Sequence, residues 1–156
     1  MRSMILRSII YSFTLSMMFF LYCPRTTSIH PDFLGAAKHF ARVSGISLVD
    51  KNLTIDYGWA DFLNEDAVAY CIPFTLPGTD ITIHRKIIID REYYNRSTIK
   101  QRELTIFHEL EHCILDRDHD DRLREDGCPL SNMFYATAPD ICIERHYKEY
   151  INEVKQ

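Results

Sequence analysis

The run HELEH at residues 108–112 places two histidines four positions apart, with a glutamate directly after the first. On an α-helix this spacing puts His108 and His112 about 40° apart around the axis and one turn apart along it. Two imidazoles in this arrangement can bind one zinc ion. Glu109 would lie beside the metal, where its carboxylate can take a proton from a zinc-activated water and pass it to a leaving amine. The run therefore predicts a zinc site with Glu109 as the general base.

A catalytic zinc needs a third protein ligand and one open position. His119, seven residues after His112, is the first candidate because a histidine is a better zinc donor than a carboxylate. The simpler interpretation of the run is a pair of surface histidines on a charged helix face. The competing candidates for the third ligand are Asp116, Asp118, Asp120 and the more distant Glu144.

The residues around HELEH form the most helix-like segment of the chain. Apolar residues recur at helical spacing from Ile99 to Leu115, and Ser97 or Thr98 is a suitable N-cap. We expect a helix of about 18 residues here, with one apolar side that packs on the rest of the domain.

The remaining segments change from helical to strand patterns and back, and the chain is about one domain long. The order predicts an α+β domain, in which a small mixed sheet packs with an N-terminal helix and the HELEH helix. The expected elements are a helix at 32–45, strands at 53–57, 67–74 and 81–90, an irregular loop at 116–139 and a last helix at about 140–154.

The run HELEHCILDRDH, followed by SNMFY with Met133, resembles the motifs of the metzincin metallopeptidases, and the chain looks like small exported bacterial members of that class. The metzincin pattern is H-E-x-x-H-x-x-G-x-x-H followed by a Met-turn. Here Leu115 stands at the glycine position, and Asp118 stands where the third histidine falls, so His119 comes one residue late. A shift by one residue aligns Asp116 with the glycine, and aspartate is among the few residues that tolerate a positive φ.

The resemblance implies further roles. Met133 would form an apolar floor under the zinc ligands, although a buried methionine is more often plain core. Tyr135 would supply a hydroxyl to the metal or to the transition state. The segment AVAYCIPF at 67–74 would be an edge strand that pairs with the backbone of a substrate.

These residues predict a zinc-dependent metalloendopeptidase that hydrolyses peptide or protein substrates, with Zn²⁺ held by His108, His112 and His119. Three alternatives are a catalytically inactive zinc-binding module, a gluzincin-like peptidase with Glu144 as the third ligand, and a surface lipoprotein without a metal. The sequence carries no signal for substrate specificity or oligomeric state.

Residues 1–28 are typical of a secretory signal. Arg2 and Arg7 precede an uncharged apolar stretch from Ile9 to Tyr22. This stretch is about 14 residues long, shorter than the roughly 20 that span a bilayer as a helix. A cleaved signal that ends near Ser28 is therefore favoured over a retained anchor.

Two other fates of this segment attach the chain to a membrane. The segment can stay as an anchor, or a lipid can be attached to Cys23, although Tyr22 is bulkier than the residue expected before a lipidated cysteine. In each case we expect an exported protein, whether periplasmic, extracellular or membrane-anchored, with residues 29–156 as the metallopeptidase domain.

The cysteines and the charge fit an exported domain. Without Cys23 the cysteine count is even, which permits one or two disulfides of undetermined connectivity. Loss of residues 1–28 would leave 15 basic against 22 acidic side chains, a formal charge of −7 instead of −4. Such a surface does not suit nucleic acids, which bind clustered Lys and Arg. The four remaining cysteines are Cys71, Cys113, Cys128 and Cys142.

Overall fold

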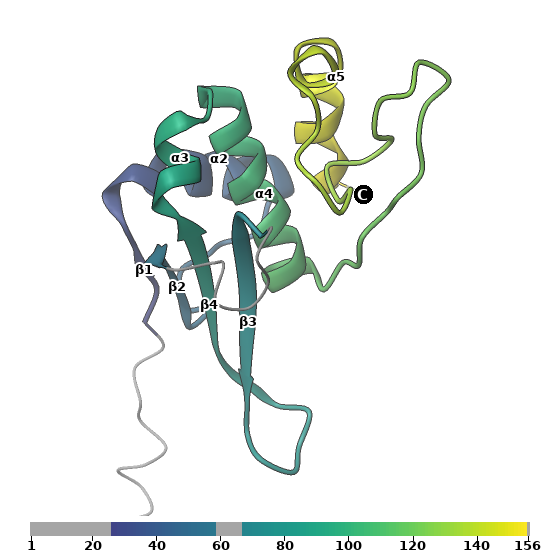
Figure 1. Cartoon of the computed structure of the whole chain (residues 1–156). Helices are drawn as coiled ribbons and strands as arrows, with labels where there is room; N and C mark the ends of the chain where they lie inside the picture. The colour runs from purple at the N-terminus through teal and green to yellow at the C-terminus, as the bar shows by residue number, and fades with distance from the viewer. Residues whose placement is uncertain (1–25, 59–66, 156) are drawn as a thin grey trace, which may run out of the picture.

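The computed structural model describes residues 26–58 and 67–155 and has the predicted α+β architecture (Figure 1). The predicted signal, with Cys23, lies almost wholly outside the described residues. In chain order the elements are β1 (Ser28–Ile29), the 3-10 helix η1 (Pro31–Phe33), α2 (Leu34–Ser44), β2 (Leu53–Gly58), β3 (Ala69–Thr75), β4 (Thr82–Asp90), α3 (Arg91–Arg96), α4 (Ile99–Leu115), α5 (Asp140–Asn152) and the 3-10 helix η2 (Glu153–Lys155).

The four strands form one mixed sheet in the order β1-β2-β4-β3. Strands β1, β2 and β4 are parallel, and β3 is antiparallel to β4. Strand β3 therefore lies at an edge of the sheet, as predicted for residues 67–74. Because parallel strands start at the same end of a sheet, the β3–β4 hairpin lies at the end where β1 and β2 begin. Figure 1 shows this hairpin projecting away from the helices.

Helix α4 carries HELEH and begins where the sequence predicts. The Thr98 side chain accepts a hydrogen bond from the backbone N–H of Gln101, and the Gln101 side chain accepts one from the backbone N–H of Thr98. This capping box satisfies donors that the first turn leaves free. The helix ends at Asp116, which has φ 54° and ψ 40°. The positive φ expected at Asp116 is confirmed.

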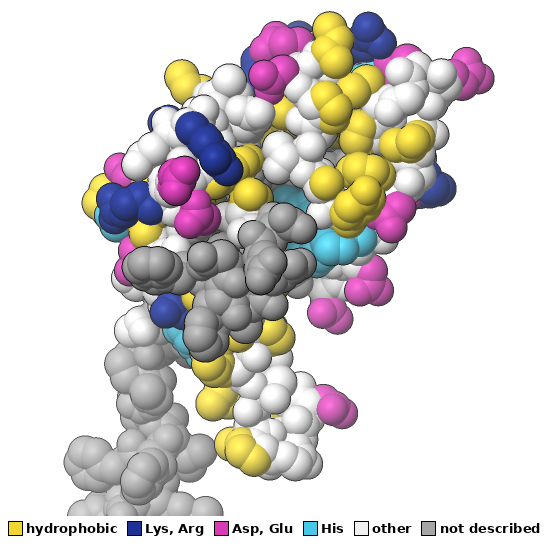
Figure 2. Space-filling view, viewed as in Figure 1, with side chains coloured by type: hydrophobic (Ala, Val, Ile, Leu, Met, Phe, Trp, Pro, Cys, Tyr) yellow, Lys and Arg dark blue, Asp and Glu magenta, His cyan; other side chains and the backbone are white. Residues whose placement is uncertain are grey.

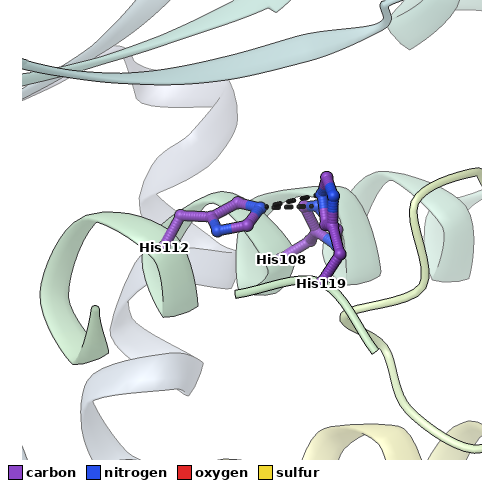
Figure 3. Close-up of side chains that lie close together, drawn as sticks. All are labelled: His108, His112 and His119. Carbon is purple, nitrogen blue, oxygen red and sulfur yellow. Dashed lines mark hydrogen bonds between the residues drawn. The ribbon is translucent and has the colours of Figure 1, made fainter. Parts of the chain in front are cut away.

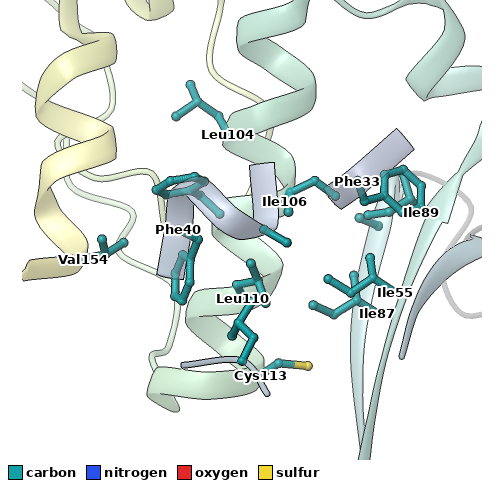
Figure 4. Packing of buried hydrophobic residues seen from close by; sticks show 14 of the residues in the cluster. Phe33, Phe40, Ile55, Ile87, Ile89, Leu104, Ile106, Leu110, Cys113 and Val154 are labelled. Carbon is teal, nitrogen blue, oxygen red and sulfur yellow. The ribbon is translucent and has the colours of Figure 1, made fainter. Parts of the chain in front are cut away.

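The hydrophobic core surrounds α4. One side of the helix contributes Leu104, Ile106, Phe107 and Leu110, each at most 5% exposed, and packs against the sheet, α2 and α5. Figure 4 shows Leu104, Ile106 and Leu110 gathered with side chains of the neighbouring elements. The partners from the sheet, η1, α2 and η2 include Phe33, Phe40, Ile55, Ile87, Ile89 and Val154.

Two short elements have no pattern in the sequence. Strand β1 has only two residues, yet Ser28 pairs with Thr54, and the Thr27 hydroxyl donates to the carbonyl of Leu48 at 2.7 Å. The domain boundary drawn after Ser28 therefore falls inside β1. Helix α3 directly follows β4, where the carboxylate of Asp90 accepts a hydrogen bond from a backbone N–H in its first turn.

Two disulfides connect the elements that surround α4. Cys71 of β3 is bonded to Cys113 of α4, and Cys128 of the loop after α4 is bonded to Cys142 of α5. The cysteine count permits one or two disulfides, and the structure has two among the residues it describes. Among the described residues no helix combines the length and the apolar character needed to cross a bilayer.

Leu110→Ala should destabilise the domain by about 2–5 kcal/mol, because it leaves a cavity where a fully buried side chain packs. Urea unfolding with the disulfides intact measures this change. The control is Ile141→Ala on α5, whose side chain is 64% exposed and which should change stability by less than about 0.5 kcal/mol. Equal effects of the two substitutions would contradict the assignment of the buried side of α4.

Candidate metal centre

Three histidine side chains converge beside α4 (Figure 3). His108 and His112 come from successive turns of the helix, and His119 comes from the loop that follows it. The Nε2 atom of His112 lies 3.1 Å from Nε2 of His108 and 3.1 Å from Nε2 of His119. Zinc binds histidine at about 2.0–2.1 Å in tetrahedral geometry, which separates neighbouring nitrogens by roughly 3.3 Å. The spacing of the three nitrogens therefore fits ligands of one zinc ion.

The protons on the helix histidines can be placed from their hydrogen bonds. Nδ1 of His108 lies 2.8 Å from the carbonyl oxygen of Asn132, and Nδ1 of His112 lies 2.6 Å from that of Arg117. Because a carbonyl oxygen only accepts, each Nδ1 donates, and Nε2 of the neutral ring carries a lone pair. Such bonds fix the tautomer and orientation of metal-binding histidines. The close Nε2 atoms thus present acceptors to one point, an arrangement that suits a cation.

Electrostatics keeps these rings in the form that binds metal. Burial lowers the pKa of His108 to about 4, although its bond to Asn132 opposes the shift. Burial also lowers the pKa of His112, with a smaller opposing effect from the carbonyl of Arg117. Both imidazoles are therefore neutral near pH 7, and a metal ion does not have to displace a proton from them.

Two glutamates support the segments that provide these carbonyls. Glu111 is fully buried, forms a salt bridge with the guanidinium of Arg117 and accepts a hydrogen bond from the Asn132 side chain at 3.4 Å. Glu153 accepts bonds from the Ser131 hydroxyl and the Asn132 backbone N–H, each at 2.9 Å. Burial raises the pKa of Glu111 to about 7 and also raises that of Glu153. Both carboxylates thus hold the backbone that orients the histidines.

Glu109 lies on the same helix and lines the same cavity as the three histidines. Its side chain is 5% exposed. Burial raises the pKa of Glu109 to about 8, and a hydrogen bond from the backbone of Cys71 opposes this shift. A carboxyl group with a pKa near neutrality can both accept and return a proton.

The turn after α4 explains how His119 reaches the helix histidines. The left-handed Asp116 reverses the chain, and the backbone N–H groups of Asp116 and Arg117 both donate to the carbonyl of Glu111. Further along, the N–H of Asp120 donates to the carbonyl of Met133 at 2.8 Å. These bonds fix the backbone on both sides of His119.

The other candidate ligands lie in different surroundings. Glu144 is exposed on α5 and pairs with the ammonium of Lys100 at 2.6 Å. Asp120 accepts two bonds from the guanidinium of Arg122, and this partner lowers its pKa to about 2. Asp116 and Asp118 line the same cavity as the histidines, but the group of ligand atoms within 4.8 Å of one another consists of His108, His112 and His119. The structure therefore brings His119, and not Glu144, to His108 and His112.

The cavity beside the histidines has a volume of about 670 Å³. Its walls are edge strand β3, α4, the loop residues 116–119 and the segment 131–138. Tyr135 contributes to this lining with a side chain that is 66% exposed. Met133 is fully buried. Its role as a floor under metal ligands stays a prediction.

A second group of potential ligands, Asp126, Cys128 and His146, is better explained as structure. Cys128 is in a disulfide, so its sulfur is not a free thiolate. The Asp126 carboxylate is already paired with Arg145 at 2.6 Å and His146 at 2.9 Å. This group ties the loop to α5.

Comparison with protein-family models, curated proteins and solved structures gives no match to this chain. The resemblance to metzincins therefore rests on the motif residues alone.

Sequence reasoning did not identify Asn132, Arg117 and Glu153 as parts of the site. Asn132 and Arg117 act through backbone carbonyls, which no side-chain pattern reveals. Glu153 lies over thirty residues from the nearest histidine of the site. Glu111 offered the only usable signal, because it lies inside HELEH next to a ligand.

Glu153→Ala should weaken zinc binding by about 10-fold or more, because loss of groups that support metal ligands has effects of this size. The substitution removes both bonds to the segment whose carbonyl orients His108. Competition with a chelating dye measures the dissociation constant. Glu149→Ala is the matched control, since this exposed carboxylate on α5 pairs with Arg124 instead. Unchanged affinity in Glu153→Ala would show that the support is dispensable.

In the metal-free protein, Glu109→Gln should increase stability at pH 8 by on the order of 2–4 kcal/mol, and by much less at pH 5. The folded-state pKa of Glu109 is raised, so its stabilising effect is present below about pH 4.5 and is lost as pH rises through about 8. His108 gives the free energy of unfolding the opposite pH dependence. This contribution is the same in the parent and in Glu109→Gln, so it cancels when the two proteins are compared. Urea unfolding in the presence of a chelator makes the comparison; a pH-independent difference would rule out the buried neutral carboxyl.

Proposed function

We propose that this chain is a zinc-dependent metalloendopeptidase, with His108, His112 and His119 as metal ligands and Glu109 as general base. The observation that carries the proposal is the convergence of three histidine side chains next to a buried glutamate that lines the same cavity. A set of three histidine ligands leaves a fourth position of zinc free, as catalytic sites require.

A bound zinc ion would supply Lewis-acid chemistry, polarising a peptide carbonyl and lowering the pKa of a water molecule. Glu109 would take the proton from that water and deliver it to the leaving amine. A hydrogen bond from the backbone of Cys71, in β3, holds the Glu109 carboxyl next to the cavity. Tyr135, on the segment 131–138, would donate its hydroxyl to the oxyanion of the tetrahedral intermediate.

The substrate we propose is an extended peptide or protein segment. Among residues 26–58 and 67–155, β3 pairs with β4 alone, and its residues from Ala69 to Cys71 line the cavity. An extended segment can add to such an edge through main-chain hydrogen bonds, with little demand on side chains. This mode of binding would present a peptide bond to Glu109 and to the metal ligands.

The proposed setting is an exported protein. Two disulfides among the described residues suit an oxidising compartment. The basic start and uncharged apolar stretch of the sequence point in the same direction.

Glu109→Gln should retain zinc and lose peptide hydrolysis by about 10²-fold or more, because it removes the general base and leaves the ligands intact. Zinc content and cleavage of a broad peptide library are measured on the same preparation. Hydrolysis by the parent must also stop when a chelator is added. If the zinc-loaded parent cleaves nothing in the library, the chain is a zinc-binding module without turnover.

The same preparations distinguish the third ligand. His119→Ala should lose most of its bound zinc, whereas Glu144→Ala should keep zinc at the level of the parent. The reverse result would favour a gluzincin-like arrangement. Absence of zinc from the parent, when purified with zinc present, would sink the proposal.

A further inference from the structure

The hairpin that joins β3 to β4 presents apolar side chains to solvent. Phe74, Leu76, Ile81 and Ile83 are 44–60% exposed and lie within ten residues of each other. Figure 2 shows hydrophobic side chains along this projecting part of the molecule. Contiguous exposed apolar side chains are usually sites of contact with another protein or with a membrane.

Several backbone groups at the hairpin tip are hydrogen-bonded within the tip itself. The N–H of Leu76 donates to the carbonyl of Ile81 at 2.8 Å, and that of Thr79 donates to the carbonyl of Leu76 at 3.1 Å. The N–H of Ile81 donates to the hydroxyl of Thr79 at 3.2 Å. Gly78, with φ 78°, permits this tight turn after Pro77. These internal bonds lower the penalty for moving the tip out of water, because unpaired backbone groups are costly in lipid.

The charges near the hairpin also suit a membrane surface. Asp80 is the single Asp, Glu, Lys or Arg between residues 73 and 83. At the base of the hairpin, Arg85 and Lys86 follow on β4, and the start of β2 is preceded by Asp50 and Lys51. Lys and Arg beside an apolar segment are attracted to anionic lipid headgroups.

The direction of β1 brings the N-terminal sequence to the same end of the molecule. Ser28 pairs with Thr54, which pairs with Lys86, so the chain before Ser28 approaches from the hairpin end of the sheet. Six residues separate Lys86 from Asp80, a length of about 20 Å in a strand. Six residues also separate Ser28 from Tyr22, the last residue of the apolar stretch, and they can extend to about 20 Å.

From these observations we propose that the β3–β4 hairpin inserts its apolar tip into the surface of a lipid bilayer. In a chain that retains its apolar N-terminal stretch, the end of that stretch and the hairpin tip can reach the same depth, so both can enter one membrane. The cavity lies toward the other end of β3, on the side of the residues Ala69 to Cys71. The hairpin would thereby hold the domain at the membrane with the cavity open to water. This inference does not depend on the proposed peptidase activity.

A single tryptophan in the hairpin of the full-length chain tests the insertion. The sequence has one tryptophan, Trp59, which is replaced by phenylalanine before Ile81→Trp is introduced. The chain is diluted from detergent into vesicles of equimolar phosphatidylcholine and phosphatidylglycerol, with or without bromine on the acyl chains. Insertion predicts a blue-shifted emission that loses most of its intensity in the brominated vesicles.

The matched control is Ile99→Trp in the same background. Ile99 is 82% exposed at the start of α4, at the opposite end of β4 from the hairpin, and its emission should be unaffected by bromine. Adding Leu76→Asp to the Ile81→Trp chain should remove most of the quenching, while circular dichroism verifies that the fold is kept. Equal quenching at the two tryptophans, or quenching that Leu76→Asp leaves unchanged, overturns the proposal. So does an Ile81→Trp emission that shows no blue shift in the vesicles, since the tip would then stay in water.

Discussion

The burial of one side of α4 is the constraint on which the candidate site depends. Leu110 and Phe107 are fully buried, and full burial of a large apolar side chain contributes about 1.5–3 kcal/mol. A shift of α4 by one residue along the chain would rotate its side chains by about 100°. This rotation would expose the apolar side and carry His108 and His112 away from the cavity. The histidines themselves contribute little to the choice of rotation. The hydrophobic core therefore sets the positions of His108 and His112, the two candidate metal ligands on α4.

Polar groups around α4 also help to position the histidines. The ion pair between the buried Glu111 and the partly exposed Arg117 is a weak source of stability, because desolvation of Glu111 opposes the attraction between the charges. Their effect here is positional, since the paired residues hold the carbonyls that orient two imidazoles. Glu111 is therefore needed to position the candidate ligands, although an apolar residue in its place would stabilise the domain equally well.

The sequence predicted the parts of the site that depend on local spacing. The start of α4 and the strand at 67–74 follow from residue types and periodicity, and the structure confirms them. The positive φ at Asp116 followed from the resemblance to the metzincin motif, and Asp116 has φ 54°. The choice of His119 rested on donor chemistry, and the structure brings that side chain to the helix histidines. The zinc ion and the roles of Met133 and Tyr135 stay predictions.

Contacts between distant segments had no comparable signal. The pairing of four cysteines is undetermined by their positions, because it depends on which elements pack together. The carbonyls of Asn132 and Arg117 belong to the main chain and would be present with any side chain. Strand β1 has two residues, too few for an alternating pattern. The exposure of the hairpin tip depends on where the sheet ends, which composition does not specify.

The bond between Cys71 and Cys113 crosslinks the edge strand to the helix that carries Glu109. Cys71 also donates its backbone hydrogen bond to that glutamate, so the wall of the cavity and the buried carboxyl belong to one covalent frame. In a reducing cytosol this frame would be open. In an oxidising compartment the same bond keeps the edge strand and the buried carboxyl in register.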